Sequence, residues 1–181
     1  MKQHFLLIPL LFTALFGTVT VQAQTQSTAA KKVVKPAVNK PAPDFTLKTP
    51  DGKDLALSSL QGHVVLVDFW ASWCRPCRAS IPHLKEIYTK YHPAGLEILS
   101  VSLDDRAHIN AWKQAMSQEQ MPWPQVVDTF TDEDETYGQV SRMYGIQSIP
   151  FVLLVDKEGK LLAINPSAET IDKKLTKIFS E

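Results

Sequence analysis

Cysteine is nearly absent from this chain of 181 residues, which contains only Cys74 and Cys77. A structural zinc site needs about four ligands. The chain has no second cysteine pair, and its five histidines show no metal-ligand spacing. Covalent haem attachment requires a histidine directly after the second cysteine, where this chain has Arg78. The sequence therefore predicts no metal site and no bound cofactor.

Acidic residues are absent from the first 43 positions, which hold five lysines. Residues 44–181 hold 14 basic and 19 acidic residues, so this part is near −5 although the whole chain is formally neutral. Binding to nucleic acid requires basic side chains that neutralise phosphates. The acidic balance argues against nucleic acid as a partner. The acidic run at 132–135 is interpreted as a solvated stretch before a helix, with a docking patch as the alternative.

The N-terminus has no cysteine, which excludes a lipoprotein anchor, and its pattern is that of an export signal. An apolar run covers 5–16, and Val21-Gln22-Ala23 offers small residues at a cleavage site. The stretch 5–21 is at the lower length limit for a membrane span and is broken by Pro9. We therefore expect a signal peptide over 1–23 and a periplasmic or otherwise extracytoplasmic protein. An uncleaved membrane anchor is the alternative.

Residues 24–43 are rich in Ala, Lys, Thr, Gln and Pro and contain little that could be buried. This composition is typical of a flexible tether. Apolar residues make up 44% of the chain, which is enough for the core of one ordinary domain. We predict a flexible linker over 24–43 and one folded domain over 44–181.

The two cysteines lie in the segment Trp73-Cys74-Arg75-Pro76-Cys77, between an apolar run at 64–70 and a helical pattern from Ile81 onward. The start of a helix offers free backbone N–H groups and a partial positive charge, which stabilise a thiolate. A second thiol one turn away can then attack the mixed disulfide. A static disulfide is the alternative outside the cytosol, but so short a loop removes little entropy from the unfolded chain. The spacing favours a redox-active pair.

The segment Val67–Cys77 closely resembles the active-site segment of thioredoxin-fold oxidoreductases, and the wider pattern resembles their exported TlpA/ResA-like branch. Pro41–Leu47 is similar to the first strand of that branch, and Tyr144–Pro150 is similar to its cis-proline loop. The stretch 151–160 resembles its hairpin. The resemblance extends from Pro41 to Glu181.

The resemblance and the alternation of strands with helices imply an α/β fold, a thioredoxin-like sandwich with a central mixed β-sheet flanked by helices. An N-terminal β-hairpin extension and a helical insert are expected additions. Strands are expected at 45–48, 55–57, 64–70, 96–103, 124–127, 151–155 and 161–164. Helices are expected at 74–91 with a bend at Pro82, from Asp104 or Asp105 to about Met116, at 136–144, and after Ser167 as a cap.

Cys74 is the expected nucleophile, because it stands at the predicted helix start, where we expect it to be accessible. The cation of Arg75 is expected to stabilise the Cys74 thiolate, and a solvated charge without effect is the alternative. Cys77 lies one turn further in and is expected to be less exposed, which suits a resolving thiol. Pro76 presets φ for the first helical turn. Together with Trp73, Ile149 and Pro150, it is also expected to contact the substrate.

Asp68 is the second residue of interest, because a charged group inside an apolar strand is costly unless it is used or paired. Thioredoxins carry an aspartate at this offset, and the resemblance implies that Asp68 accepts the proton of Cys77. Many exported relatives have asparagine there, and some carry a glutamate where this chain has Ser80. Burial is expected to raise the pKa of Asp68 above about 3.9. An aspartate satisfied by local hydrogen bonds is the alternative.

By resemblance, Pro150 is expected to be cis and to face the dithiol. A cis bond would let Ile149 pair with an incoming extended polypeptide, and an ordinary trans proline at a strand start is the alternative. Trp73 is expected to form a surface near the cysteines, whereas Trp70 and Trp123 are expected to pack internally.

The resemblance implies an exported thiol–disulfide oxidoreductase that reduces disulfides of envelope proteins through Cys74 and Cys77. A membrane thiol–disulfide electron donor would regenerate the dithiol, and maturation of c-type cytochromes is the best-known role of such proteins. The direction of the exchange depends on the reduction potential of the cysteine pair relative to that of the compartment. A disulfide oxidant or isomerase is therefore an alternative. We expect a monomer.

Two other classes of function are alternatives to a thiol–disulfide oxidoreductase. Pro41–Leu47 is also similar to the first segment of peroxiredoxin-like peroxidases, but these place the reactive cysteine after Pro-x-x-x-Thr, a pattern that is absent before Cys74. A non-catalytic module, such as a copper carrier or an assembly chaperone, is the second class. Copper carriers of this fold usually have a wider cysteine spacing and a dedicated histidine, which are not evident here.

Overall fold

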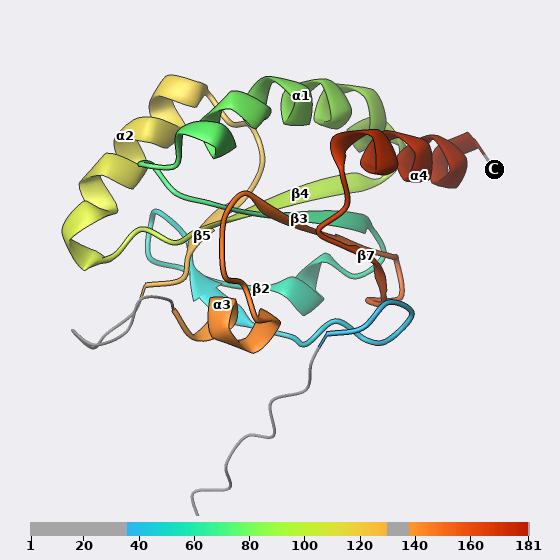
Figure 1. Ribbon diagram of the computed structural model, residues 1–181, viewed down its shortest axis with the longest axis horizontal. Helices are drawn as coiled ribbons and strands as arrows, with labels where there is room; N and C mark the ends of the chain where they lie inside the picture. The colour runs from blue at the N-terminus through green and yellow to red at the C-terminus, as the bar shows by residue number, and fades with distance from the viewer. Residues whose placement is uncertain (1–35, 130–137, 181) are drawn as a thin grey trace, which may run out of the picture. The chain divides into compact units, whose positions relative to one another are not determined.

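One mixed β-sheet organises the computed structural model, which describes residues 36–129 and 138–180 (Figure 1). The strands are β1 (Thr46–Lys48), β2 (Asp54–Ala56), β3 (Val64–Trp70), β4 (Leu96–Ser102), β5 (Gln125–Val127), β6 (Phe151–Val155) and β7 (Leu161–Ile164). Their order across the sheet is β2-β1-β5-β4-β3-β6-β7. β3 pairs in parallel with β4 and antiparallel with β6, as the predicted mixed sheet requires.

Helices cover both faces of this sheet. The α-helices are α1 (Arg75–Tyr91), α2 (Ile109–Glu119), α3 (Gln139–Tyr144) and α4 (Ala168–Ser180), and the one-turn helices are η1 (Leu57–Leu60), η2 (His92–Ala94) and η3 (Arg106–His108). Figure 1 shows α1, α2 and α4 on one face and the short α3 on the other. The arrangement confirms the α/β sandwich with an N-terminal β1–β2 hairpin.

The central strand β3 is buried at every position, as its apolar run predicted. Successive side chains of a strand point to opposite faces. Val67 and Phe69 therefore join a core cluster with residues of α3, whereas Leu66 packs with Ile81 and Leu84 of α1. Asp68 shares its face with Leu66, so its carboxylate lies on the side of the sheet that α1 covers.

The predicted helix after β4 begins later than expected. η3 comes first, and α2 starts at Ile109 and ends at Glu119, beyond Met116. Asp105 caps η3, because its Oδ1 accepts the N–H of His108 at 3.0 Å. Asp104 was the other candidate for this cap, but its carboxylate lies against Ser72 of the loop before α1.

Residues 39–42, which belong to the linker predicted over 24–43, form backbone hydrogen bonds with Leu161 of β7 and with Gly159 before it. The N–H of Asn39 donates to Leu161 at 2.8 Å, and Leu161 returns a bond to Lys40 at 2.9 Å. The N–H of Ala42 donates to Gly159 at 2.9 Å. Composition did not indicate this pairing, because backbone hydrogen bonds to the edge strand β7 require no apolar side chain.

The last helix agrees with its prediction, since the N–H of Thr170 donates to the hydroxyl of Ser167 at 3.3 Å. The helix predicted at 136–144 lies partly outside the described residues, and the acidic run at 132–135 lies wholly outside them. Among the residues that the structure describes, no helix combines the length and the apolar character needed to cross a membrane.

Candidate active site

Cys74 and Cys77 form a disulfide at the start of α1, with their Cα atoms 5.3 Å apart. Cys74 is the N-cap residue, and its Sγ accepts the backbone N–H of Cys77 at 3.3 Å. A sulfur in this position receives both the free N–H groups and the positive end of the helix dipole. The geometry is therefore the one that stabilises a thiolate after reduction.

The sequence predicted that Cys74 is accessible to solvent, and this prediction is wrong for the disulfide state. Cys74 is only 4% exposed, and Cys77 is 1% exposed. The reason is that the side chain of Cys74 turns back onto the first turn of α1, where it bonds to Cys77. The expected order of exposure between the two cysteines is nevertheless confirmed. Arg75 and Pro76, which complete the first turn, are both exposed.

An apolar cluster surrounds the disulfide. Trp70 and Trp112 are each 1% exposed and belong to the same cluster as the two cysteines. Ile149 packs against this cluster, so residues far apart in the chain meet at the redox pair. The internal packing predicted for Trp70 is confirmed.

The peptide bond between Ile149 and Pro150 is cis, as the family resemblance implied. Pro150 is exposed, and Ile149 is half-buried with its side chain against the cysteine cluster. This places the loop before β6 beside the disulfide.

Trp73 stands out on the surface next to Cys74, with 62% of its area exposed. It lines an open groove of about 280 Å³ together with Ser72, Arg78, His108 and four residues of α2 (Ala111, Gln114, Ala115 and Gln118). The surface role predicted for Trp73 therefore agrees with its position.

Asp68 is buried on β3 and is 2% exposed. Its Oδ2 accepts the hydroxyl of Ser100 at 3.1 Å, and the Oγ of Ser100 accepts the indole N–H of Trp123 at 2.8 Å. Burial raises the pKa of Asp68 to about 7, and the bond from Ser100 opposes this rise. The buried carboxyl can therefore exchange a proton near neutral pH.

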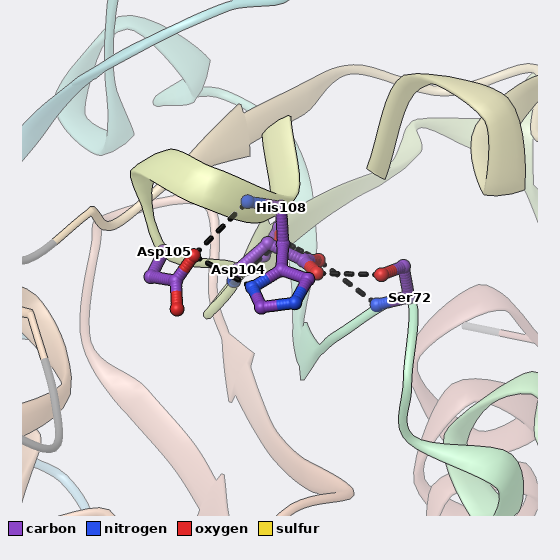
Figure 2. A network of polar contacts seen from close by, with 5 residues as sticks. Ser72, Asp104, Asp105 and His108 are labelled. Carbon is purple, nitrogen blue, oxygen red and sulfur yellow. Dashed lines mark hydrogen bonds and ion pairs between the residues drawn. The ribbon is translucent and has the colours of Figure 1, made fainter. Parts of the chain in front are cut away.

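Asp104 lies at the end of β4 and is fully buried. Figure 2 shows its carboxylate facing Ser72, while the neighbouring Asp105 faces His108. Asp104 accepts the N–H of Ser72 at 2.9 Å and the hydroxyl of Ser72 at 2.6 Å. The hydroxyl of Ser102 donates to it at 2.6 Å. Three donors thus satisfy this buried carboxylate.

Sequence reasoning did not identify Ser72, Ser100 or Asp104 as part of the site. One signal was present: Ser100 and Ser102 alternate with apolar residues along the strand at 96–102. Polar side chains inside a buried strand need hydrogen-bond partners, and both serines face buried aspartates. Within 36–129 and 138–180, no three His, Cys, Asp or Glu side chains are grouped so that they could hold a metal ion.

Comparison with known proteins gives a family and a common activity. The model of the AhpC/TSA family matches residues 38–164. The thiol-disulfide oxidoreductase ResA of Geobacillus thermodenitrificans is 32% identical over 156 residues, covering 86% of this chain and 80% of that protein. ResA of Bacillus thuringiensis is 30% identical over 131 residues, covering 72% and 70%.

Solved structures agree with these relatives. The thioredoxin domain of a thiol-disulfide oxidoreductase from Bacteroides vulgatus superposes with a TM-score of 0.69 at 31% identity, covering 79% of this chain and 98% of that domain. A thiol:disulfide interchange protein from a Bacteroides species superposes with a TM-score of 0.69 at 30% identity, covering 82% of this chain and 93% of that protein. The fold and the family resemblance read from the sequence are thereby confirmed: the chain belongs to the AhpC/TSA family and is a ResA-like thiol–disulfide oxidoreductase.

Proposed function

We propose that this protein reduces disulfides of extracytoplasmic proteins, with Cys74 as the attacking thiol and Cys77 as the resolving thiol. The observation that carries the proposal is the position of Cys74 as the N-cap of α1, disulfide-bonded to the next cysteine of the same turn. The named activity of the relatives, thiol–disulfide oxidoreduction, supports the same assignment.

The reaction consists of two exchanges. The thiolate of reduced Cys74 attacks one sulfur of the substrate disulfide, and the other substrate sulfur leaves as a thiolate and takes a proton. Cys77 then loses its proton and attacks the Sγ of Cys74, which releases the second substrate thiolate. The substrate gains two electrons and two protons, while Cys74 and Cys77 end as the disulfide that the structure contains.

Asp68 is proposed to receive the proton of Cys77 in the second exchange. It lies on the face of β3 that α1 covers, and Cys77 is on the inner side of α1. A pKa of about 7 lets the carboxylate take a proton near neutral pH. Its hydrogen bond with Ser100 also supports the structural alternative, so the kinetics of the second exchange must decide.

The surface residues around the two cysteines are proposed to bind the polypeptide chain of the substrate. Trp73 offers an exposed apolar side chain on one side of the cysteines. Ile149 and Pro150 form the loop against the cysteine cluster, and an extended polypeptide could pair with the backbone of Ile149. Arg75 is exposed, so solvent screens its charge and its effect on Cys74 should be small.

Export, a cleaved signal peptide over 1–23, a membrane electron donor and a monomeric state are parts of the same proposal. Export and cleavage rest on the sequence of the N-terminus, where residues 1–35 lie outside the described part of the chain. The electron donor rests on the family resemblance. Mass analysis of the protein from the cell envelope should find a new N-terminus near Gln24. An intact Met1 in the membrane fraction would indicate the uncleaved anchor instead.

A direct assay tests the activity. The protein from about residue 36, with dithiothreitol as donor, should accelerate the reduction of insulin disulfides, and Cys74→Ser should abolish the acceleration. Hydrogen peroxide as the oxidant tests the peroxidase alternative in the same preparation. Equilibration with glutathione buffers measures the reduction potential: a value below that of the compartment supports a reductant, and a higher value supports an oxidant.

A further inference from the structure

A buried aspartate outside the CxxC motif holds the turn that leads into Cys74. The turn runs from Ala71 to Cys74 and is closed by the N–H of Cys74, which donates to the carbonyl of Ala71 at 3.0 Å. Ser72 and Trp73 are its two central residues. Any motion of this turn therefore moves both the nucleophile and the exposed Trp73.

Ser72 gives both of its hydrogen-bond donors to one carboxylate. Its N–H donates to Oδ2 of Asp104 at 2.9 Å, and its hydroxyl donates to Oδ1 at 2.6 Å (Figure 2). A carboxylate that accepts two donors from one residue fixes the orientation of that residue more tightly than a single bond does.

The carboxylate is itself held in place from its own strand end. The hydroxyl of Ser102 donates to Asp104 at 2.6 Å and accepts the N–H of Asp104 at 3.0 Å. Next to it, the N–H of Leu103 donates to the carbonyl of Trp70 at 2.8 Å. The loop before α1 is thus tied to the end of β4, an element of the rigid sheet.

Asp105, the residue after Asp104, makes a second contact near the groove. Its Oδ1 lies 2.7 Å from Nδ1 of His108 and accepts the N–H of His108. Ser72, Trp73 and His108 line the same groove. Asp104 and Asp105 therefore each bond to one residue of its lining, as Figure 2 shows for Ser72 and His108.

We propose that Asp104 is a positioning residue of the redox site, which acts by fixing Ser72 and thereby keeps Cys74 at the N-cap of α1. A buried carboxylate is costly unless hydrogen bonds compensate for its lost hydration, and here two of its three donors come from the turn before the nucleophile. The inference rests on the proposed function in taking Cys74 as the attacking thiol.

The chain provides a matched control. Ser141 at the start of α3 also donates its N–H and its hydroxyl to one buried aspartate, Asp128, with the N–H bond at 2.7 Å. α3 lies on the opposite face of the sheet from α1 (Figure 1). Ser141→Ala therefore removes an equivalent hydrogen bond without touching the turn before Cys74.

The test measures alkylation of the fully reduced protein by iodoacetamide between pH 5 and 9, with the modified cysteine located by mass spectrometry. In Ser72→Ala, alkylation of Cys74 at pH 7 should slow by about fivefold, the change that one ordinary hydrogen bond corresponds to. Ser72→Thr, which keeps the hydroxyl, should retain the rate of the unaltered protein. Ser141→Ala should lower thermal stability at least as much as Ser72→Ala and leave the rate unchanged.

Asp104→Asn changes the local charge as well as the hydrogen bonds, so it is used in a double-variant cycle. If Asp104 acts through Ser72, Ser72→Ala should have less effect in the Asp104→Asn background than alone. The inference would be overturned if Ser72→Ala left the alkylation rate of Cys74 unaltered, or if Ser141→Ala lowered that rate equally. It would also be overturned if Ser72→Thr did not keep the rate, or if the effects of Ser72→Ala and Asp104→Asn were fully additive. Modification of Cys77 before Cys74 in the unaltered protein would instead refute the proposed order of attack.

Discussion

The carboxylate of Asp68 accepts the hydroxyl of Ser100 at 3.1 Å, directly across the parallel pair of β3 and β4. The two residues are opposite each other in the register of these strands. Ser100 has one hydroxyl proton, and its oxygen already accepts the indole N–H of Trp123. The proton of Ser100 is therefore directed at Asp68, which favours the ionised form of a carboxyl that burial would otherwise keep neutral.

Asp68→Asn should stabilise the protein, and more so as pH rises. The folded pKa of about 7 lies above the unfolded value of about 3.9. The stability that Asp68 contributes is thus fully present at low pH and is lost as pH rises from about 4 to about 7. The unfolding free energy of the variant should exceed that of the unaltered protein by a margin that grows across this window by at most about 1.4 kcal/mol per pH unit.

Urea unfolding at several pH values measures this margin. Asp54→Asn on β2 is the control, because Asp54 is exposed and pairs with Lys48 at the surface. A constant difference in unfolding free energy between Asp68→Asn and the unaltered protein from pH 4 to 8 would show that folding does not raise the pKa of Asp68.

The same Asp68→Asn variant should release substrate more slowly if Asp68 accepts the proton of Cys77. The first exchange, by Cys74, needs no base inside the protein and should change little. Stopped-flow reduction of a fluorescent disulfide peptide separates the two steps. Equal release rates for the variant and the unaltered protein would leave Asp68 with a structural role.

Ser100→Ala should move the pH dependence of release to higher pH. The hydrogen bond from Ser100 stabilises the carboxylate, so its loss should raise the pKa of Asp68 further. Trp123→Phe should act in the same direction and less strongly, because it frees the hydroxyl of Ser100 to turn away. Ser141→Ala on α3 is the control, and a shift of its profile as large as that of Ser100→Ala would contradict the assignment.

Cys77→Ala should accumulate a mixed disulfide through Cys74, because the resolving thiol is gone. Adducts recovered from the cell envelope and mapped by mass spectrometry would identify the substrate proteins. Apocytochromes c among them would support a role in cytochrome c maturation. Adducts attached at any other residue of the chain would contradict Cys74 as the attacking residue.

Trp73→Ala should weaken the use of protein substrates without destabilising the fold. Its side chain is 62% exposed, so truncation removes little buried area. A large apolar side chain at the centre of an interface often contributes more than about 1 kcal/mol, so kcat/KM for insulin should fall by about fivefold or more. Val38→Ala, which shortens another exposed apolar side chain, is the control. Equal kcat/KM values for Trp73→Ala and the unaltered protein would exclude Trp73 from the substrate surface.

The redox pair and its surroundings along the chain could be predicted from the sequence. Cys74, Cys77, the buried strand before them and the helix after them are continuous in sequence, so local pattern and spacing are sufficient. The cis bond before Pro150 was predicted from the family resemblance. Local pattern could not predict it, because an Ile-Pro pair can adopt either a cis or a trans peptide bond.

Tertiary structure decided how the polar groups of the site are paired. Asp68 and Ser100 are 32 residues apart, as are Ser72 and Asp104. Such pairs depend on the register between β3 and β4, which shifts every contact when it changes by one residue. The sequence identified Asp68 as a costly carboxylate inside an apolar strand. Only the packed sheet determined that Ser100 bonds to it, and that Asp104 holds the turn before Cys74.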